Sequence, residues 1–338
     1  MKVAITADLQ FATQFKLSHE TSQGISSRLL DQVKCFHWMV DTAVERECEA
    51  FLSLGDIYDA RNVLPVSVVD QVGRCYAYAA EQIEHNHILV GNHDSLLRSP
   101  AVNSLQTLRG LADVWDEPGV WGPFAFVPWI EDPDEYRSAV GLVAQGTAVW
   151  ETKADYMFSH VMIEGAVPAD IGRAKRDLRP QQWKRIFLGD IHEPLSFDPN
   201  IQYAGAPMQH HFGDVGGERG FWILDTDTDE IEFIENVMSP RFHILTTADV
   251  GHVGAADFVR VRADDPELAE AIVREVGKVC AWVENETVRL PGEVQPRLDV
   301  SGEESYEGIL RRYVEHCGGD DPDGLTEAGL ELLREVGA

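Results

Sequence analysis

The sequence predicts an α/β protein in which helices cover a layered, largely parallel sheet. Apolar runs of strand length end repeatedly in polar residues, as in VAITAD, AFLSLGD, HILVGNHD, YMFSH and RIFLGD. Such continuous apolar runs are typical of strands that are covered on both faces. Apolar residues at helical spacing separate the first three runs, at 29–44 and, after Pro65, at 68–83. This strand–helix–strand alternation indicates an α/β layered domain.

The later strands have shorter connections. We expect strands at 124–129 (FAFVPW) and 220–226 (GFWILDT), which suggests a mixed sheet or two stacked sheets. After Ser239 and Pro240, a strand at 257–263 and a helix at 266–279 indicate a small α+β unit. A helix follows at 306–317, a Gly/Asp linker at 318–324 and an amphipathic helix at 326–336. The predicted domains are therefore 1–239, 240–317 and 318–338.

The composition is that of a strongly acidic globular protein. The formal net charge is −29 over 338 residues, which weighs against unspecific nucleic-acid binding through bulk charge. A local basic patch or binding through metal ions is compatible with that charge. The five cysteines never form a CxxC pair, which favours a reducing cytosol over a disulfide framework. No apolar run approaches the ~18 residues of a membrane helix.

Polar side chains follow five of the predicted strands. In an α/β sheet, functional residues gather at the carboxyl ends of the strands. A single aspartate there is usually a turn former, and a single histidine is usually a hydrogen-bonded core residue. Five such groups together are hard to explain as turns, because unpaired buried polar groups cost several kcal/mol. The groups are Asp8 with Gln10, Asp56 with Asp59, Asn92 with His93, His160, and Asp190 with His192.

These residue types form a mixed oxygen and nitrogen ligand set. Carboxylates, an amide oxygen and imidazoles suit Mn²⁺, Mg²⁺, Fe or Zn²⁺ rather than a thiolate site. Seven candidate ligands are too many for one ion, whereas two ions about 3.5–4 Å apart would use them around a bridging carboxylate. Two close dications have one common use, which is to hold a phosphoryl group and activate water. The pattern therefore predicts phosphate-ester hydrolysis.

The order of the motifs resembles a known family. The segments D-x-Q, GDxxD, GNHD, an isolated His and GDIH are similar to the five motifs of calcineurin-like metallophosphoesterases. The similarity is greatest to SbcD-type double-strand-break repair nucleases, notably the phage recombination endonuclease subunits. Supporting segments are GAPMQHHFGD (205–214), SPRFHIL (239–245) and EGILRRYVEH (307–316). The resemblance implies a four-layer α-β-β-α sandwich with a small C-terminal α+β capping domain.

The resemblance also implies roles for single residues. Asp8, Gln10, Asp56 and His192 would hold the first metal, and Asp56, Asn92, His160 and Asp190 would hold the second. Asp56 would bridge the two ions. His93 would be a catalytic residue beside the scissile phosphate, where it helps the leaving oxygen to acquire a proton. Asp94, grouped with it, has two open roles, which are to orient His93 or to cap the next helix.

Two positions depart from the family pattern. The family usually has His where Gln10 stands and GHxH where this chain has GDIH. Both changes replace a nitrogen donor by an oxygen donor, so the predicted site is harder and favours Mn²⁺, or Mg²⁺, over Zn²⁺. Because Gln10 is a weaker neutral ligand, an impaired nuclease is an open alternative.

A basic segment and the chain's C-terminal part suggest partners. Residues 172–185 contain six bases and one acid. The bases would contact DNA phosphates beside the metals, or they would form an ordinary exposed helix face. They are Arg173, Lys175, Arg176, Arg179, Lys184 and Arg185. The resemblance implies a homodimer acting in the cytoplasm, the host's if the chain is phage-encoded. It also implies an SbcC-type, SMC-like ABC ATPase that docks on the C-terminal region.

The function that follows is a two-metal DNA nuclease in repair or recombination. The family acts on double-stranded ends as a 3′-to-5′ exonuclease and on single strands as an endonuclease. Two alternatives stay open from the sequence. One is a phosphodiesterase or phosphatase for small molecules, and the other is a catalytically impaired scaffold that binds the ATPase.

Overall fold

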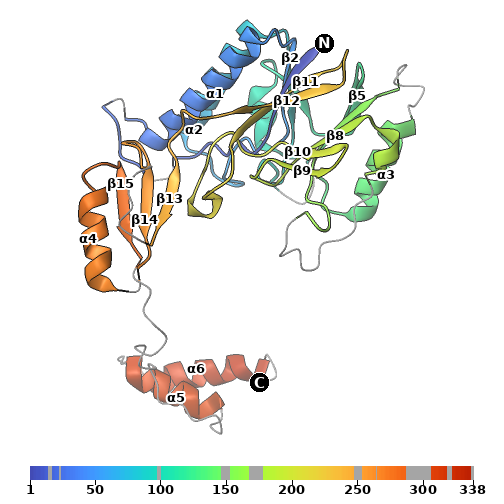
Figure 1. Ribbon diagram of the computed structural model, residues 1–338. Helices are drawn as coiled ribbons and strands as arrows, with labels where there is room; N and C mark the ends of the chain where they lie inside the picture. The colour runs from blue at the N-terminus through green and yellow to red at the C-terminus, as the bar shows by residue number, and fades with distance from the viewer. Residues whose placement is uncertain are drawn as a thin grey trace.

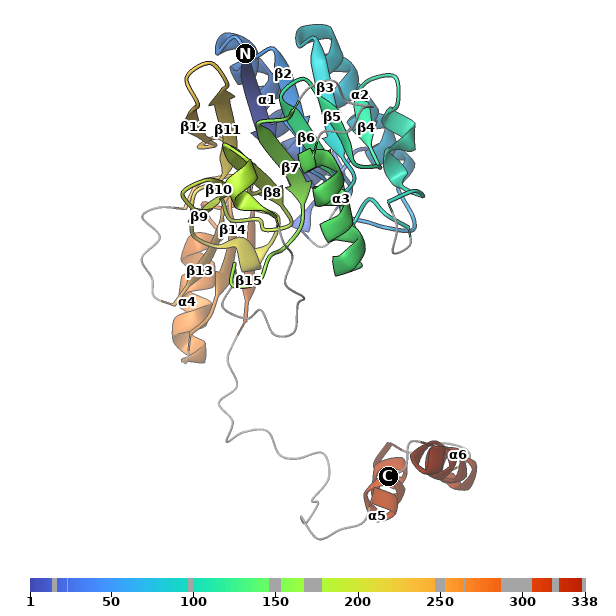
Figure 2. The ribbon, with the colours of Figure 1, turned by 90° about the vertical axis from the view of Figure 1, so that its right-hand side faces the viewer.

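Two six-stranded sheets form the body of the protein (Figures 1 and 2). The computed structural model describes residues 1–13, 17–22, 24–96, 100–145, 153–166, 178–246, 253–263, 265–286, 306–317 and 322–335. The first sheet runs in the order β12-β11-β1-β2-β3-β4. Its strands are β1 (Lys2–Thr6), β2 (Ala50–Ser53), β3 (His85–Leu89), β4 (Asp113–Trp115), β11 (Gly220–Asp225) and β12 (Glu230–Glu235).

The second sheet runs in the order β5-β6-β7-β8-β10-β9. Its strands are β5 (Gly119–Trp121), β6 (Phe124–Val127), β7 (Tyr156–His160), β8 (Arg185–Gly189), β9 (Leu195–Asp198) and β10 (Ile201–Tyr203). In each sheet four neighbouring strands pair in parallel, and two more join through antiparallel pairing: β11 and β12 in the first, and β5 and β9 in the second. The prediction of an α/β protein with mixed sheets is confirmed.

Helices cover the outer faces of both sheets (Figure 1). On the first sheet lie α1 (Ser27–Glu45), whose N-cap Ser26 accepts a hydrogen bond from Leu29, and α2 (Val66–Gln82), which follows Pro65. The outer face of the second sheet packs on α3 (Pro133–Gln145), in front of that sheet in Figure 2. A third apolar layer, including Leu52 and Phe158, joins the inner faces of the two sheets. The layer order is therefore helix, sheet, sheet, helix.

A small three-stranded parallel sheet follows β12 in sequence. It consists of β13 (Phe242–Leu245), β14 (Phe258–Val261) and β15 (Trp282–Asn285), with α4 (Pro266–Val276) packed on it. Buried Arg28 of α1 fixes this sheet to the body. Its guanidinium donates to the Gln209 carbonyl and lies 5.3 and 5.1 Å from the ring centroids of Phe242 and Phe258.

The last two described helices pack on each other. They are α5 (Tyr306–Cys317) and α6 (Pro322–Glu335), and a side chain at Gly329 of α6 would meet Leu310 of α5. The linker predicted at 318–324 was partly wrong, because α6 begins at Pro322 and includes the last residues of that range. Residues 318–321 lie outside the described residues. Within the described residues, none of the helices combines the length and apolarity needed to cross a membrane.

Three short 3-10 turns complete the described elements. They are η2 (Ser104–Leu108), η3 (Pro180–Gln182) and η4 (Phe212–Asp214). Of these, η4 lies next to the predicted metal residues, because the Asp214 carboxylate accepts a hydrogen bond from the His192 ring at 3.0 Å.

Candidate metal centre

Three predicted ligands meet at the carboxyl ends of the strands. One ligand atom each from Asp8, Asp56 and His160 lies within 4.8 Å of the other two, and all three residues are buried. Asp8 follows β1 and Asp56 follows β2, both in the first sheet, whereas His160 ends β7 in the second sheet. The cluster therefore lies where the two sheets meet, and residues 152 positions apart contribute to it.

The backbone at this cluster is strained. Positive φ angles occur at Asp8 (52°), Gln10 (43°), Asp56 (53°) and Asp190 (88°), which are four of the seven such non-glycine residues in the described part of the chain. Backbone hydrogen bonds tie two of these turns together, from Asp8 N to Gly55 O at 3.0 Å and from Gln10 N to Asp56 O at 2.9 Å. Such strain persists only where surrounding structure imposes it, and it concentrates at functional sites.

Two motif glycines let the strand ends approach closely. A Cβ atom at Gly91 would lie 2.2 Å from Asp56 Oδ1, and one at Gly189 would lie 2.4 Å from the Leu54 carbonyl oxygen. Neither distance is compatible with a side chain. These glycines precede Asn92 and Asp190, so the GN and GD pairs are required by close packing around the ligands.

The hydrogen bonds of His160 aim one nitrogen into the cluster. Its Nδ1 lies 2.6 Å from the Leu54 carbonyl oxygen and donates to it. Its Nε2 then lies 2.9 Å from the side-chain amide of Asn92 and 3.4 Å from Asp56 Oδ1. Burial opposes a charge on His160, but the carboxylates of Asp56, Asp8 and Asp190 outweigh it and hold the pKa of the ring well above its usual value. An imidazole oriented from behind by a carbonyl is the usual arrangement of a metal ligand.

The carboxylates are too close together to be stable without a positive partner. The backbone N–H of Asp190 donates to both carboxylate oxygens of Asp8, at 3.3 and 3.2 Å, and Asp190 Oδ1 lies 4.0 Å from His160 Nε2. Burial, together with the charge of Asp56, raises the pKa of Asp8 to about 7. Buried carboxylates, an amide oxygen and one imidazole nitrogen fit a hard divalent cation such as Mn²⁺ or Mg²⁺.

A second group of potential ligands lies beside His192. The ligand atoms of His192, His211 and Asp214 also lie within 4.8 Å of one another. The Asp214 carboxylate is already occupied: one oxygen accepts from His192 Nδ1 at 3.0 Å and the other from the backbone N–H of His210 at 2.7 Å. Burial opposes a charge on His192, and the hydrogen bond to Asp214 outweighs it and raises the ring's pKa. We interpret Asp214 as the group that orients His192 and leaves its Nε2 for a metal.

Gln10 and His93 occupy different places around the cluster. The carboxamide of Gln10, which is nearly buried, makes no hydrogen bond with any described residue. The backbone N–H of His93 donates to Asp56 Oδ1 at 2.8 Å, and its ring Nδ1 lies 2.7 Å from the Asp59 carbonyl oxygen. The His93 side chain is 30% exposed.

Neither of the two roles left open for Asp94 agrees with the structure. Its carboxylate is buried and accepts from four backbone N–H groups, those of Asp56, Ile57, Tyr58 and Gly91, at 2.8 to 3.2 Å. It therefore neither contacts the His93 ring nor caps a following helix. Asp94 holds the turn after β2 that presents Asp56, and its assignment as a catalytic residue is corrected to a positioning residue.

The basic segment lies away from the cluster where the structure describes it. Lys184 pairs with Asp155 at 3.0 Å and Arg185 pairs with Asp229 at 3.2 Å, both at the amino end of β8. Asp190 follows the other end of that strand, about 16 Å away at ~3.3 Å per residue. Arg179 packs over Gly141 of α3. The remaining bases, Arg173, Lys175 and Arg176, lie outside the described residues.

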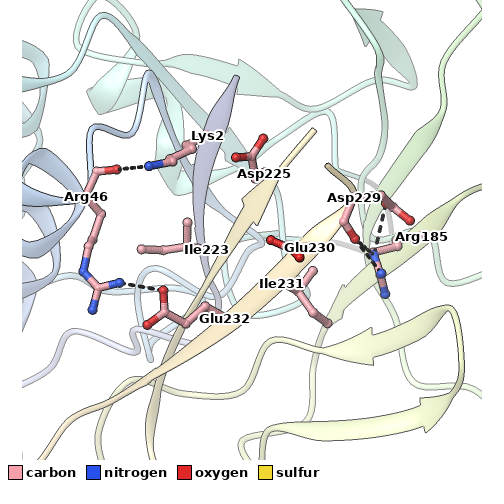
Figure 3. A pocket seen from close by; sticks show the side chains of 9 residues that line it. All are labelled: Lys2, Arg46, Arg185, Ile223, Asp225, Asp229, Glu230, Ile231 and Glu232. Atoms are coloured by element: carbon pink, nitrogen blue, oxygen red, sulfur yellow. Dashed lines mark hydrogen bonds and ion pairs between the residues drawn. The ribbon is translucent and has the colours of Figure 1, made fainter. Parts of the chain in front are cut away.

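A pocket of about 550 Å³ adjoins Arg185 at this far end of the strands (Figure 3). Its basic side chains already have partners: Arg46 pairs with Glu232 at 2.6 Å, Arg185 pairs with Asp229, and Lys2 donates to the Arg46 carbonyl at 3.2 Å. With its bases paired and four acids in its lining, the pocket does not suit a phosphate. The structure therefore does not support the Lys184 and Arg185 assignments as DNA contacts beside the metals.

Three contributors to the site were missed by sequence reasoning. Asp214 orients His192, and His210 donates from Nε2 to the Asp8 carbonyl at 2.8 Å. Both lie in the segment GAPMQHHFGD (205–214), which supported the family resemblance but was given no part in holding the metals. The third is Arg61, whose Nη2 lies 3.0 Å from the side-chain amide of Asn92. Arg61 makes no ion pair with the residues that the structure describes.

Comparison with known proteins agrees with the motif order. No protein-family model matches the chain. Exonuclease subunit 1 of Enterobacteria phage T4 is 24% identical over 304 residues, which cover 84% of each chain. The SbcD component of the nuclease SbcCD from Staphylococcus epidermidis is 24% identical over 126 residues, or 32% of this chain and 34% of that protein.

Two solved structures show only weak overall similarity. A dimetal phosphatase from Danio rerio gives a TM-score of 0.38 at 13% identity, covering 66% of this chain and 91% of its own. The Pseudomonas putida nuclease MPE gives 0.26 at 16% identity, covering 59% and 66%. The motif order resembles that of calcineurin-like metallophosphoesterases, and the chain is similar in sequence to phage T4 exonuclease subunit 1 and to SbcD.

Proposed function

We propose that this chain is the nuclease subunit of an ATPase-driven DNA repair or recombination complex and hydrolyses DNA phosphodiesters with two divalent cations. The observation that carries the proposal is the convergence of Asp8, Asp56 and His160 within 4.8 Å. Similarity to an exonuclease subunit over 84% of the chain supports DNA as the substrate. We expect 3′-to-5′ exonuclease action on duplex ends and endonuclease action on single strands.

The residues around the cluster would divide between two cation positions, with Asp56 shared by both sets. The first set is Asp8, Gln10, Asp56 and His192, and the second is Asp56, Asn92, His160 and Asp190. When bound, the two cations would neutralise the phosphate and activate water for attack on phosphorus. The surrounding fold contributes by holding Asp56 through Asp94 and His192 through Asp214.

His93 and Arg61 are the chain's own groups that face the substrate. Because His93 Nδ1–H donates to the Asp59 carbonyl, Nε2 can give a proton to the leaving oxygen only when the ring is the imidazolium cation, with both nitrogens protonated. Arg61 places a guanidinium beside Asn92, where it can donate to a non-bridging phosphate oxygen. Both side chains belong to the loops that follow β2 and β3.

The remaining domain and partner assignments are proposals from the same resemblance. The three-stranded unit over 240–317 would act as a capping domain that contacts DNA. The C-terminal helix α6, in 318–338, would supply the docking region for an SbcC-type ATPase. Homodimerisation through the catalytic domain is also proposed from the family.

The test compares linear duplex DNA with a chromogenic phosphodiester in Mn²⁺, Mg²⁺ and Zn²⁺, with bound metal measured on the same protein. We expect DNA cleavage with Mn²⁺ and loss of both metal and cleavage in Asp56→Ala. Cleavage of the chromogenic ester alone would favour the small-molecule phosphodiesterase. A protein that binds no metal and cuts neither substrate would support the scaffold.

A further inference from the structure

Two neighbouring histidines, His210 and His211, have opposite surroundings. His210 is buried, and its Nε2 donates to the Asp8 carbonyl oxygen at 2.8 Å. His211 follows with an extended backbone, at φ −154° and ψ 176°. Its side chain is 57% exposed. One histidine of the pair therefore supports a predicted metal ligand, and the other is accessible from solvent.

The backbone that carries His211 is fixed on both of its sides. On one side, the backbone N–H of His211 donates to Asp214 Oδ2 at 3.3 Å, while Asp214 Oδ1 accepts from His192 Nδ1 at 3.0 Å. On the other side, the Gln209 carbonyl accepts a hydrogen bond from buried Arg28. The position of His211 relative to His192 is therefore set by the fold and does not depend on a ligand.

The orientation of the His211 ring is fixed by Gly213. His211 Nδ1 accepts a hydrogen bond from Gly213 N at 2.9 Å, which places the proton of the neutral ring on Nε2. A Cβ atom at Gly213 would lie 2.7 Å from His211 Cε1, so the ring can lie there only because residue 213 is a glycine. The Nε2–H group makes no hydrogen bond with the residues that the structure describes. His211 is thus an oriented donor with nothing to donate to.

This donor lies beside one of the proposed metal ligands. The ring centroids of His211 and His192 are 5.7 Å apart, and one ring nitrogen of each lies within 4.8 Å of the other. A metal site of His192, His211 and Asp214 alone would be poorly supplied, because both oxygens of Asp214 already accept hydrogen bonds. The position suits a group that contacts whatever the metal centre holds, and a phosphate offers several oxygens that accept hydrogen bonds.

We propose that the Nε2–H group of His211 donates a hydrogen bond to a non-bridging oxygen of the phosphate held at the metal centre. This inference rests on the proposed function and deepens it by adding a residue that binds the phosphate itself. Non-bridging oxygens are present in substrate and product alike, so the contact strengthens the binding of both. The competing role for His211 is purely structural, as the cap of η4 through Nδ1 and Gly213.

Two substitutions separate the two nitrogens of His211. Asparagine places an accepting oxygen where Nδ1 lies and has no donor at the position of Nε2, whereas glutamine places a donor there and does not retain the cap. Calorimetric titration with thymidine 5′-monophosphate in Mn²⁺ measures the Kd. We expect His211→Asn to raise the Kd about 10-fold and His211→Gln to stay within about 3-fold of the unchanged chain. His85→Asn, at a partly exposed histidine that begins β3, should bind like the unchanged chain.

Bound Mn²⁺ is measured on the same samples and should be equal in all of them. A purely structural role would reverse the order, with normal binding in His211→Asn and weakened binding in His211→Gln, and would overturn the proposal. Loss of Mn²⁺ in His211→Asn would overturn it too, since His211 would then be a ligand, as would no nucleotide binding by the unchanged chain.

Cleavage of linear duplex DNA in Mn²⁺ is scored separately. If the unchanged chain cuts DNA and His211→Asn keeps its nucleotide affinity, the phosphate contact is rejected and the nuclease remains. If nucleotide binding depends on His211 in a chain that cuts no DNA, the contact remains and the nuclease is rejected.

Discussion

The Asp94 carboxylate accepts a hydrogen bond of 2.8 Å from the backbone N–H of Asp56. Three further backbone N–H groups, those of Ile57, Tyr58 and Gly91, complete the shell of Asp94. One buried carboxylate thus joins the turn after β2 to the end of β3. Because Asp56 has a φ of 53°, this shell is what keeps its side chain directed at Asp8 and His160.

We predict that Asp94→Asn weakens metal binding without removing a ligand. The new amide group would face backbone donors in place of an accepting oxygen, which should cost about 2 kcal/mol of stability. Mn²⁺ affinity should fall 10- to 100-fold, as is usual for groups that support ligands. Calorimetric titration and thermal unfolding measure the two effects. Asp198→Asn, at an exposed aspartate, is the control, and unchanged Mn²⁺ affinity in Asp94→Asn would contradict this role.

His93→Ala should show the opposite pattern. The residue contacts Asp56 only through its backbone N–H, which alanine retains, so both metals should still bind. Cleavage should fall about 10²- to 10⁴-fold, because the leaving oxygen loses its proton donor. The measurement is kcat together with metal content. If the variant lost bound metal, His93 would be a ligand or a supporting residue.

The strands that carry the motifs were predictable because their local pattern and burial agree. β1, β2, β7 and β8 are largely apolar runs, β3 (HNHIL) overlaps the predicted run only from His87 to Leu89, and α1 and α2 follow helical spacing after Ser26 and Pro65. Pairing partners were not predictable in this way. β11 lies antiparallel beside β1, with Lys2 opposite Asp225, and nothing local in either strand specifies a partner so distant in sequence. α3 was not predicted, although Tyr136, Val140 and Val143 follow helical spacing along its buried face.

The site was predictable in residue type and less so in role. Strand-end position correctly pointed to Asp8 and Asp56, which share one carboxyl edge of the first sheet, and to His160, which the second sheet brings to that edge. The roles of Asp94 and Asp214 depend on which backbone groups their oxygens meet, and those groups belong to other turns. Lys184 and Arg185 lie at the amino end of β8, whereas Asp190 follows its carboxyl end, so their nearness in sequence does not make them neighbours in space.

Asp214→Asn should distinguish the two interpretations of the His192 group. If Asp214 orients His192, metal affinity should fall 10- to 100-fold, while His211→Ala should leave it nearly unchanged. If the three residues instead form a site of their own, both variants should lose the same ion. Metal content after dialysis against micromolar Mn²⁺ measures this. An equal loss in His211→Ala would reject the orienting role.

His87 should make the protein less stable as the pH falls from 7 to 4. The ring is 1% exposed between the sheets, beside Trp115 and Phe126, and burial lowers its pKa from 6.5 to about 4 against the opposing effect of Asp113. Below pH 6.5 the unfolded chain binds a proton that the folded chain does not, so the free energy of unfolding decreases until the folded ring titrates near pH 4. The free energy of unfolding therefore falls by about 3 kcal/mol between pH 7 and pH 4.

The variant that isolates this effect is His87→Gln. Its carbonyl oxygen can still accept the hydrogen bond that the Trp115 indole N–H donates to His87 Nδ1 at 3.3 Å, but the side chain does not titrate. Urea unfolding at pH 7 and at pH 4.5 gives the free energy at each pH. The decrease on acidification should be about 2–3 kcal/mol smaller in His87→Gln than in the unchanged chain. The control His19→Gln, at an exposed histidine, should retain the full decrease. If His87→Gln showed the same pH dependence as the unchanged chain, the buried ring would already be protonated at pH 4.5.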